Sequence, residues 1–194
     1  MSLRNAIVCI VAASLMVTPG FATTYKSPDG TLTLSARSVE IYTDKLVAAG
    51  KAHVKWVDPQ TKATLEADAE KIVAKVAVGK GAKPAKGSTP VQSADLTGPV
   101  KMVYTIVDAN GATSKIVATA DSADFDGATN LAHLVGHVKI TNENPAVFAE
   151  PAVMVGDKAT VNLAPNPGPD DFRFRVESAP GVSSITVTPK AKEN

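Results

Sequence analysis

Three histidines are the side chains best suited to acid–base or metal chemistry: His53, His133 and His137. His133 and His137 share one face of a strand-like run, because successive strand residues alternate between faces. At about 3.3 Å per residue they lie roughly 13 Å apart, too far for one metal ion whose bonds to histidine are about 2 Å long. We therefore expect solvent-facing strand residues rather than metal ligands.

A group of acids, Asp121, Asp124 and Asp126 followed by Gly127, resembles part of a calcium-binding loop. The loop order Asp-x-Asp-x-Asp-Gly with a distal glutamate is not met, however. Asp at a turn between strands has a sufficient structural reason, because its side chain hydrogen-bonds the nearby backbone. The spacing thus favours turn formers over metal ligands.

Residues 79–88 are rich in glycine and lysine but lack the G-x-x-x-x-G-K-[ST] order of a phosphate-binding loop. We predict that residues 79–93 form a flexible, solvated loop inserted between two strands; contact with anionic lipid headgroups is the less favoured alternative. No G-x-S-x-G element and no Ser/His/Asp arrangement stands out. The sequence therefore predicts a protein that is not an enzyme and that needs no cofactor or metal.

The first 22 residues have the layout of a cleaved secretory signal peptide. Arg4 precedes an apolar run over residues 6–17, which is shorter than the ~20 residues of a membrane span, and small residues precede a cleavage point after Ala22. Removal of this segment takes away Arg4 and no acid, so 20 Lys and Arg become 19, against 19 Asp and Glu. This balance argues against a nucleic-acid partner. The mature chain also loses Cys9, the one cysteine, and cannot form disulfides.

The rest of the chain alternates apolar and polar residues with the period of two that half-buried strands require. In residues 46–56 the even positions are small or apolar, whereas Lys51, His53 and Lys55 are odd. Residues 63–78 are the nearest candidate for a helix. Regular turn signals, such as Asp108-Ala109-Asn110-Gly111, separate the runs. We predict one all-β domain of antiparallel strands over residues 23–190, with a polar tail at 191–194.

Residues 34–55 and 115–140 repeat one unit, a strand, a turn and a second strand that contains a glycine. The glycine positions are Gly50-Lys51 and Gly136-His137, and Gly98-Pro99 is a third fragment with the same ending. Self-similarity of this kind indicates stacked copies of one supersecondary unit.

This repeat resembles the OstA-like repeat of the LptA/OstA-like family of lipopolysaccharide-transport proteins, which includes LptC and the N-terminal domain of LptD. The resemblance runs from about Leu32 to Lys190. The family often has asparagine after the repeat glycine, where this chain has Lys51, Pro99 and His137. The resemblance implies a V-shaped, twisted β-jellyroll whose apolar interior receives lipid acyl chains. It further implies a periplasmic bridge between LptC-like and LptD-like partners, with possible head-to-tail homo-oligomers.

Strand parity and family position together predict the residues that face the interior and bind lipid. The terminal edges are predicted at the run beginning at Thr31 and at residues 184–188. Composition alone favours an ordinary core of Val, Ala and Leu over a groove between sheets, and the alternative function is a structural or assembly module that pairs edge strands without lipid. The predicted interior residues are Leu32, Leu34, Val54, Trp56, Val103, Phe125, Val138 and Ile140.

Overall fold

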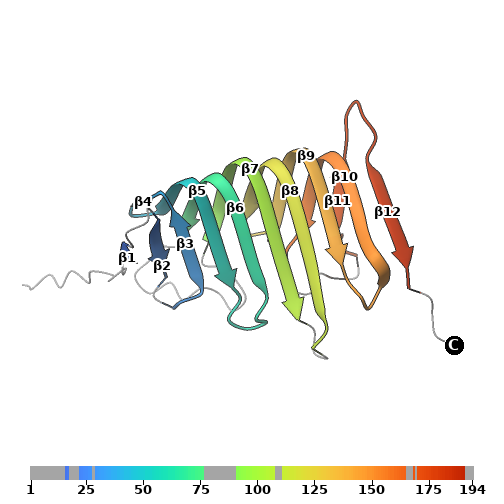
Figure 1. Cartoon of the computed structure of the whole chain (residues 1–194), viewed down its shortest axis with the longest axis horizontal. Coiled ribbons are helices and arrows are strands. Elements are labelled where there is room, and N and C mark those ends of the chain that lie inside the picture. Colours follow the sequence, from blue (N-terminus) through green and yellow to red (C-terminus); the bar gives the residue numbers. More distant parts are fainter. Residues whose placement is uncertain are drawn as a thin grey trace, which may run out of the picture.

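The computed structural model describes residues 16–17, 22–27, 29–76, 91–107, 111–164, 168 and 170–190. Every regular element in these ranges is a β-strand, and every strand pairing is antiparallel (Figure 1), which confirms the predicted all-β fold. No helix in the described ranges is long and apolar enough to cross a membrane. Of the predicted signal peptide, only residues 16–17, which form β1, and residue 22 are among the described residues. The predicted tail at 191–194 lies outside them.

The strands form one 12-stranded sheet. Their bounds are β1 Met16–Val17, β2 Thr23–Lys26, β3 Leu32–Ala36, β4 Ser38–Ile41, β5 Lys45–Val57, β6 Thr64–Val76, β7 Val91–Val107, β8 Thr113–Asp126, β9 Leu131–Glu143, β10 Phe148–Asn162, β11 Phe174–Glu177 and β12 Ser184–Pro189. Since β7 begins at Val91, residues 91–93 belong to a strand, and the prediction that they are loop is wrong. The rest of the predicted loop, 79–90, lies outside the described residues.

The six long strands, β5 to β10, each cross from one half of the folded sheet to the other. One half, which we call the β3 half, has β2, β3 and β12 at its ends; the other, the β4 half, has β4 and β11 at its ends. Figure 1 shows the long strands side by side, each curving across the molecule. The predicted V-shaped jellyroll is thus a single sheet folded along one line.

That line, the crease, is a row of β-bulges. Every pairing of neighbouring long strands shifts register at one level, for example between Ala49 and Ala52 where β5 meets β6, and between Thr119 and Ser122 where β8 meets β9. A bulge adds a residue to one strand and bends it. A row of bulges at the same level bends the whole sheet.

The repeat glycines lie on this crease because no other residue fits there. Gly50, Gly98 and Gly136 have φ of 80°, 88° and 80°, a region that residues with a Cβ rarely occupy. A Cβ at Gly136 would lie 2.7 Å from the carboxyl carbon of Asp121 on the adjacent strand. Lys51 and His137 also have positive φ, 55° and 46°, which asparagine tolerates better than most residues. The backbone thus explains the asparagine found after this glycine in the resembling family.

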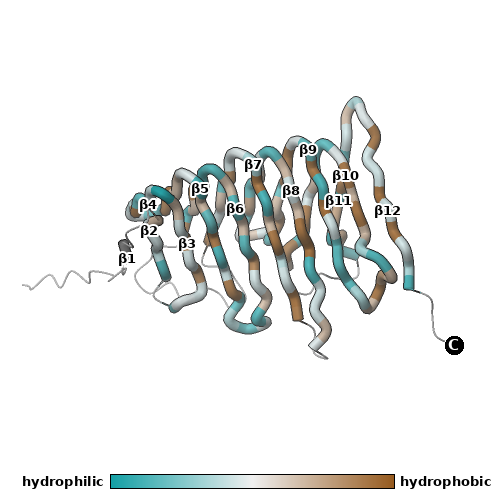
Figure 2. The backbone as a smooth tube through the Cα atoms, in the orientation of Figure 1, coloured by the Kyte–Doolittle hydropathy of each residue, from teal (hydrophilic) through white to brown (hydrophobic). Residues whose placement is uncertain are grey.

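The interior is built by alternation, as Figure 2 shows by the change of hydropathy along the strands. In β5 and β9 the even residues face the interior on both sides of the crease, because these strands contain the extra residue of the bulge. In β6 the buried residues change from odd to even, with Ala69 and Ile72 both inside and Glu70 and Lys71 both exposed. The strand that pairs with a glycine bulge therefore buries odd-numbered residues on one side of the crease and even-numbered residues on the other.

The edges of the sheet differ at one end from the prediction. The run from Thr31 is no edge, because β3 lies between β2 and β5. At that end the outer strands are β4, which pairs only β5, and β2 with the short β1. At the other end β12 pairs only β10, so the predicted edge over residues 184–188 is confirmed.

Gly136→Ala should lower the free energy of unfolding by about 2 kcal/mol or more, because it adds a methyl group against Asp121 at a left-handed position. Gly111→Ala is the matched control: Gly111 has φ of 81°, but no atom lies within 4 Å of the place that a Cβ would take, so only the conformational cost of about 1 kcal/mol remains. Urea denaturation measures both variants. Equal losses would show that crowding at the crease is unimportant.

Candidate functional site

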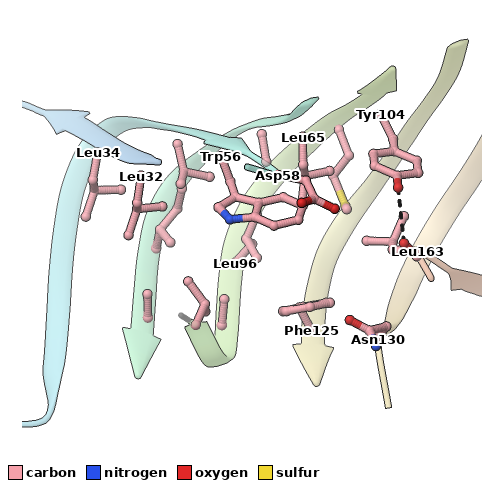
Figure 3. A pocket seen from close by; sticks show the side chains of 17 residues that line it. Leu32, Leu34, Trp56, Asp58, Leu65, Leu96, Tyr104, Phe125, Asn130 and Leu163 are labelled. Carbon is pink, nitrogen blue, oxygen red and sulfur yellow. Dashed lines mark hydrogen bonds between the residues drawn. The ribbon is translucent and has the colours of Figure 1, made fainter. Parts of the chain in front are cut away.

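A partly enclosed apolar cavity of about 80 Å³ lies between the two halves of the sheet, towards the β3 end. Its walls come from β3, β5, β6 and β7, with Phe125 of β8, Asn130 and Leu163 closing the side nearest the C-terminal strands (Figure 3). Such a volume is several times the minimum for one water molecule. Almost all of the lining is hydrocarbon, so the cavity suits an apolar ligand.

Small side chains create this space. Ala67, Ala74 and Ala94 line the cavity at positions where larger residues would fill it. Away from the cavity, alanines also pair with larger residues, as Ala123 does with Leu134 and Ala118 with Ile140, and all four belong to the buried core. Composition favoured an ordinary core over a groove, and the structure contains both, in different parts of the same interior.

Five of the eight residues predicted to face the interior line the cavity: Leu32, Leu34, Val54, Trp56 and Phe125. They come from β3, β5 and β8, and Leu32 pairs across the sheet with Trp56. The structure therefore brings these five together around one space. Their role in binding lipid stays a prediction.

Val138 and Ile140 lie inside but away from the cavity. Both are 0% exposed and belong to the packed core beside Leu134 and Met154. They face the interior as parity requires, but neither lines this cavity.

Val103 is placed differently from its prediction. Its neighbours Met102 and Tyr104 are buried, at 7% and 3% exposure, and both line the cavity. Successive strand residues point to opposite faces, so Val103 lies on the outer face, where it pairs with Glu66 and Val117. The prediction that Val103 faces the interior is wrong, and alternation counted from the buried Val100 would have selected Met102 and Tyr104 instead.

Sequence reasoning missed several other lining residues. Leu65 lies on the same face of its strand as Ala67, so alternation alone could have identified it. Ile72 and Leu96 line the cavity from the β4 half. Ile72 follows the parity change at the crease and could not be assigned by counting from Ala67. Leu163 continues the alternation of Ala159 and Val161, and all three are buried, although Leu163 lies just past the end of β10.

A hydrogen bond joins the two halves of the sheet across the interior. The hydroxyl of Tyr104, in the β3 half, donates to the backbone carbonyl of Leu163, in the β4 half, at 3.2 Å (Figure 3). Burial raises the pKa of Tyr104, so the phenol stays protonated and remains a donor at neutral pH. The bond ties the two walls together at the side of the cavity.

Trp56 of β5 and Asp58, which follows that strand, bring polar atoms to the cavity. Burial acts to raise the pKa of the Asp58 carboxyl, but hydrogen bonds from the Thr61 hydroxyl and the Gln60 backbone N–H outweigh it and lower the pKa. Asp58 is therefore an ionised turn former. The Trp56 indole nitrogen is buried and, among the described residues, has no hydrogen-bond partner.

The histidines and acids considered first take structural positions. Nδ1 of His137 lies 2.8 Å from a carboxylate oxygen of Asp121, and His53 makes the same contact with Asp68. Asp126 accepts from the Ala128 backbone N–H, so it forms the turn as predicted. The prediction that Asp121 and Asp124 also form this turn is wrong, because both lie within β8, Asp121 at the crease. In the described ranges no group of three or more His, Cys, Asp or Glu could hold a metal ion.

The fold and the cavity define a class, the β-jellyroll of stacked hairpins with an apolar interior. A family profile described as the LptA and LptD N-terminal domain of lipopolysaccharide-transport proteins matches residues 28–164, and the chain belongs to this family. The crystal structure of LptH from Pseudomonas aeruginosa, described as the LptA-homologous periplasmic component of a lipopolysaccharide transport device, has the same fold. Its TM-score is 0.53 at 13% identity, over 81% of this chain and 95% of that one. A search of curated proteins gave no match.

Ala67→Leu should be tolerated, with a free energy of unfolding within about 1 kcal/mol of the unsubstituted chain, because the cavity accepts the added carbons. The matched control is Ala159→Leu, at a buried alanine between Leu134 and Val176, where the core is packed. There the same change should cost about 1–3 kcal/mol through overpacking. Chemical denaturation compares them, and an equal cost at both sites would contradict the cavity.

The Asp121 carboxylate accepts a hydrogen bond from His137 and attracts its positive charge, and both effects raise the pKa of His137 above its ordinary value of 6.5. Because the pKa is raised on folding, the pair's contribution to stability is fully present below about pH 6.5 and is lost as the pH rises through the folded-state pKa. Asp121→Asn should move the pKa of His137 down towards 6.5, as measured by NMR titration of the ring.

Asp157 acts on His137 by charge alone, so Asp157→Asn is the control and should lower the pKa less. A pKa of His137 that stays unchanged in Asp121→Asn would exclude this pairing in solution.

Proposed function

We propose that the protein is a non-enzymatic periplasmic carrier that holds lipopolysaccharide acyl chains between the two halves of its sheet. The observation that carries the proposal is the apolar cavity, whose lining comes from both halves. Burial of an acyl chain gains about 0.8 kcal/mol per CH₂ group, so an apolar channel suffices to hold a lipid without any charged contact. Family membership supplies the class of lipid.

A whole acyl chain needs more room than about 80 Å³, so the halves must separate as lipid enters. The crease joins them through continuous strands along one side only. Opposite the crease, the Tyr104–Leu163 hydrogen bond is a direct link between them. A net contribution of about 1 kcal/mol for such a bond is small beside the gain from several buried CH₂ groups.

The two ends of the sheet support a bridging role. β12 is an edge strand on which Ile185 and Val187 are 63% and 43% exposed (Figure 2). At the opposite end β4 has one side unpaired. Unpaired strand edges extend a neighbour's sheet through backbone hydrogen bonds. We propose that LptC-like and LptD-like proteins, or further copies of this chain arranged head to tail, pair with these edges.

The N-terminal segment supports export. Cleavage after Ala22 would release the mature chain into the periplasm and would remove β1, which leaves β2 as the outer strand of the β3 half. The jellyroll domain then spans residues 23–190. Nucleic acid has no place in this proposal, because the mature charge is balanced.

A photo-crosslinking amino acid in place of Phe125 should capture lipopolysaccharide in cells, because Phe125 lines the cavity. The same substitution at Val103, on the outer face of the neighbouring strand, is the control and should capture little. Immunoblotting for lipopolysaccharide on the purified protein provides the measurement.

Capture at neither position by protein that is folded and exported would contradict lipid transport. It would favour the alternative, an assembly module that pairs edge strands without lipid. Equal capture at Phe125 and Val103 would also count against a ligand held between the halves.

A further inference from the structure

We infer that Trp56 selects the kind of chain that the cavity accepts: its indole N–H donates a hydrogen bond to a neutral oxygen carried on an otherwise apolar ligand. The preferred ligand class is then an acyl chain with an ester or amide carbonyl, rather than a plain hydrocarbon. This inference rests on the proposed lipid-carrying function and adds a polar contact to it.

The first observation is the unused donor. Trp56 Nε1 is buried and has no hydrogen-bond partner among the described residues, and it is the one buried side-chain nitrogen or oxygen there in this state. Buried polar groups are otherwise almost always hydrogen-bonded, because an unmet donor loses its water and gains nothing in return. An indole N–H can only donate, so the missing group is an acceptor.

The second observation is the position of this donor. Trp56 lines the cavity, and Figure 3 shows its ring lying across the space, with the nitrogen on the side of Leu32 and away from Asp58. Leu32 and Leu65 are its partners on the neighbouring strands, and neither side chain can accept a hydrogen bond. The nitrogen itself is covered in this structure, so a ligand would reach the N–H as the two halves of the sheet separate to admit it.

Two of the other polar groups near the cavity are already engaged, and a third, Asn130, lies beside Phe125 on the far side from Trp56 (Figure 3). The Asp58 carboxylate accepts from Gln60 and Thr61 in its own turn, and the Tyr104 hydroxyl donates to Leu163. A water molecule bound to Trp56 would need two or more polar partners, which the apolar walls around the ring do not offer.

The charge of the surroundings decides the kind of acceptor. The walls are apolar and the nearby Asp58 is ionised, so a carboxylate would lose its hydration and face a like charge. A neutral carbonyl has a much smaller desolvation cost and still accepts the bond. The cavity should thus favour esters and amides over both free fatty-acid anions and alkanes.

A matched pair of probes tests this inference: methyl decanoate, which has an ester, and tridecane, which has the same number of heavy atoms and no acceptor. Binding of each to the full chain is measured by equilibrium partition from a cyclodextrin carrier. Trp56→Phe keeps an aromatic ring and removes the donor. It should weaken binding of methyl decanoate about two- to tenfold and leave binding of tridecane within about twofold.

A second measurement needs no variant. Trp56 is the one tryptophan of the chain, so its indole N–H gives a single side-chain resonance in a ¹⁵N NMR spectrum. Methyl decanoate should shift the indole proton downfield, as a new hydrogen bond does, whereas tridecane should not.

Equal weakening of both probes by Trp56→Phe would overturn the inference, because Trp56 would then act through shape alone. An indole proton that responds alike to both probes would overturn it as well. If crosslinking at Phe125 captures lipopolysaccharide while the ester has no advantage, the proposed function stands and this inference fails. If neither probe binds and Phe125 captures nothing, the proposed function itself fails.

Discussion

The row of bulges along the crease is the constraint on which the rest of the structure depends. Each bulge lets one long strand serve both halves of the sheet, so the two walls of the interior are covalently continuous. The bend requires left-handed backbone at Gly50, Gly98 and Gly136, and close packing against the side chains of the strands beside them. The hydrophobic interior can form only because the crease faces the apolar positions of both halves towards each other.

The same architecture yields a cavity at one end and a packed core at the other because side-chain size changes along the sheet. Ala67 lines the cavity from the β3 half and the paired Ala74 and Ala94 line it from the β4 half, whereas the β9 residues Leu134, Val138 and Ile140 are fully buried. The buried residues of β9 supply stability that the cavity does not, since burial of large apolar side chains is the main favourable term in folding. In the proposed carrier, one end of the interior would stabilise the fold and the other would hold the ligand.

Much of the fold follows from the sequence, because alternation and glycine spacing are local signals. Alternation predicted the strands and the repeat predicted the stacked hairpins. Seven of the eight residues predicted to face the interior do so, and five of them, including Trp56 and Phe125, line the cavity. Errors arose where a local count is insufficient. Val103 was assigned to the wrong face although its neighbours determine its parity, and Ile72 lies past a parity change that only the three-dimensional pairing reveals. The cavity itself depends on which alanines face one another, and no single strand records that.

The interior polar groups give the lipid-carrying proposal its chemical detail. Tyr104 and Trp56 both carry a hydrogen-bond donor in an interior with few acceptors, but only the Tyr104 donor has a partner. Tyr104 reaches the Leu163 carbonyl across the fold and holds the two halves together, while the Trp56 N–H is left for a ligand. Separation of the halves would free the Tyr104 hydroxyl as well, so an incoming chain that carries a carbonyl would meet two donors where a plain hydrocarbon would leave both unsatisfied. An acyl chain that enters would break the Tyr104–Leu163 hydrogen bond, and its own carbonyl would replace the acceptor that Tyr104 loses.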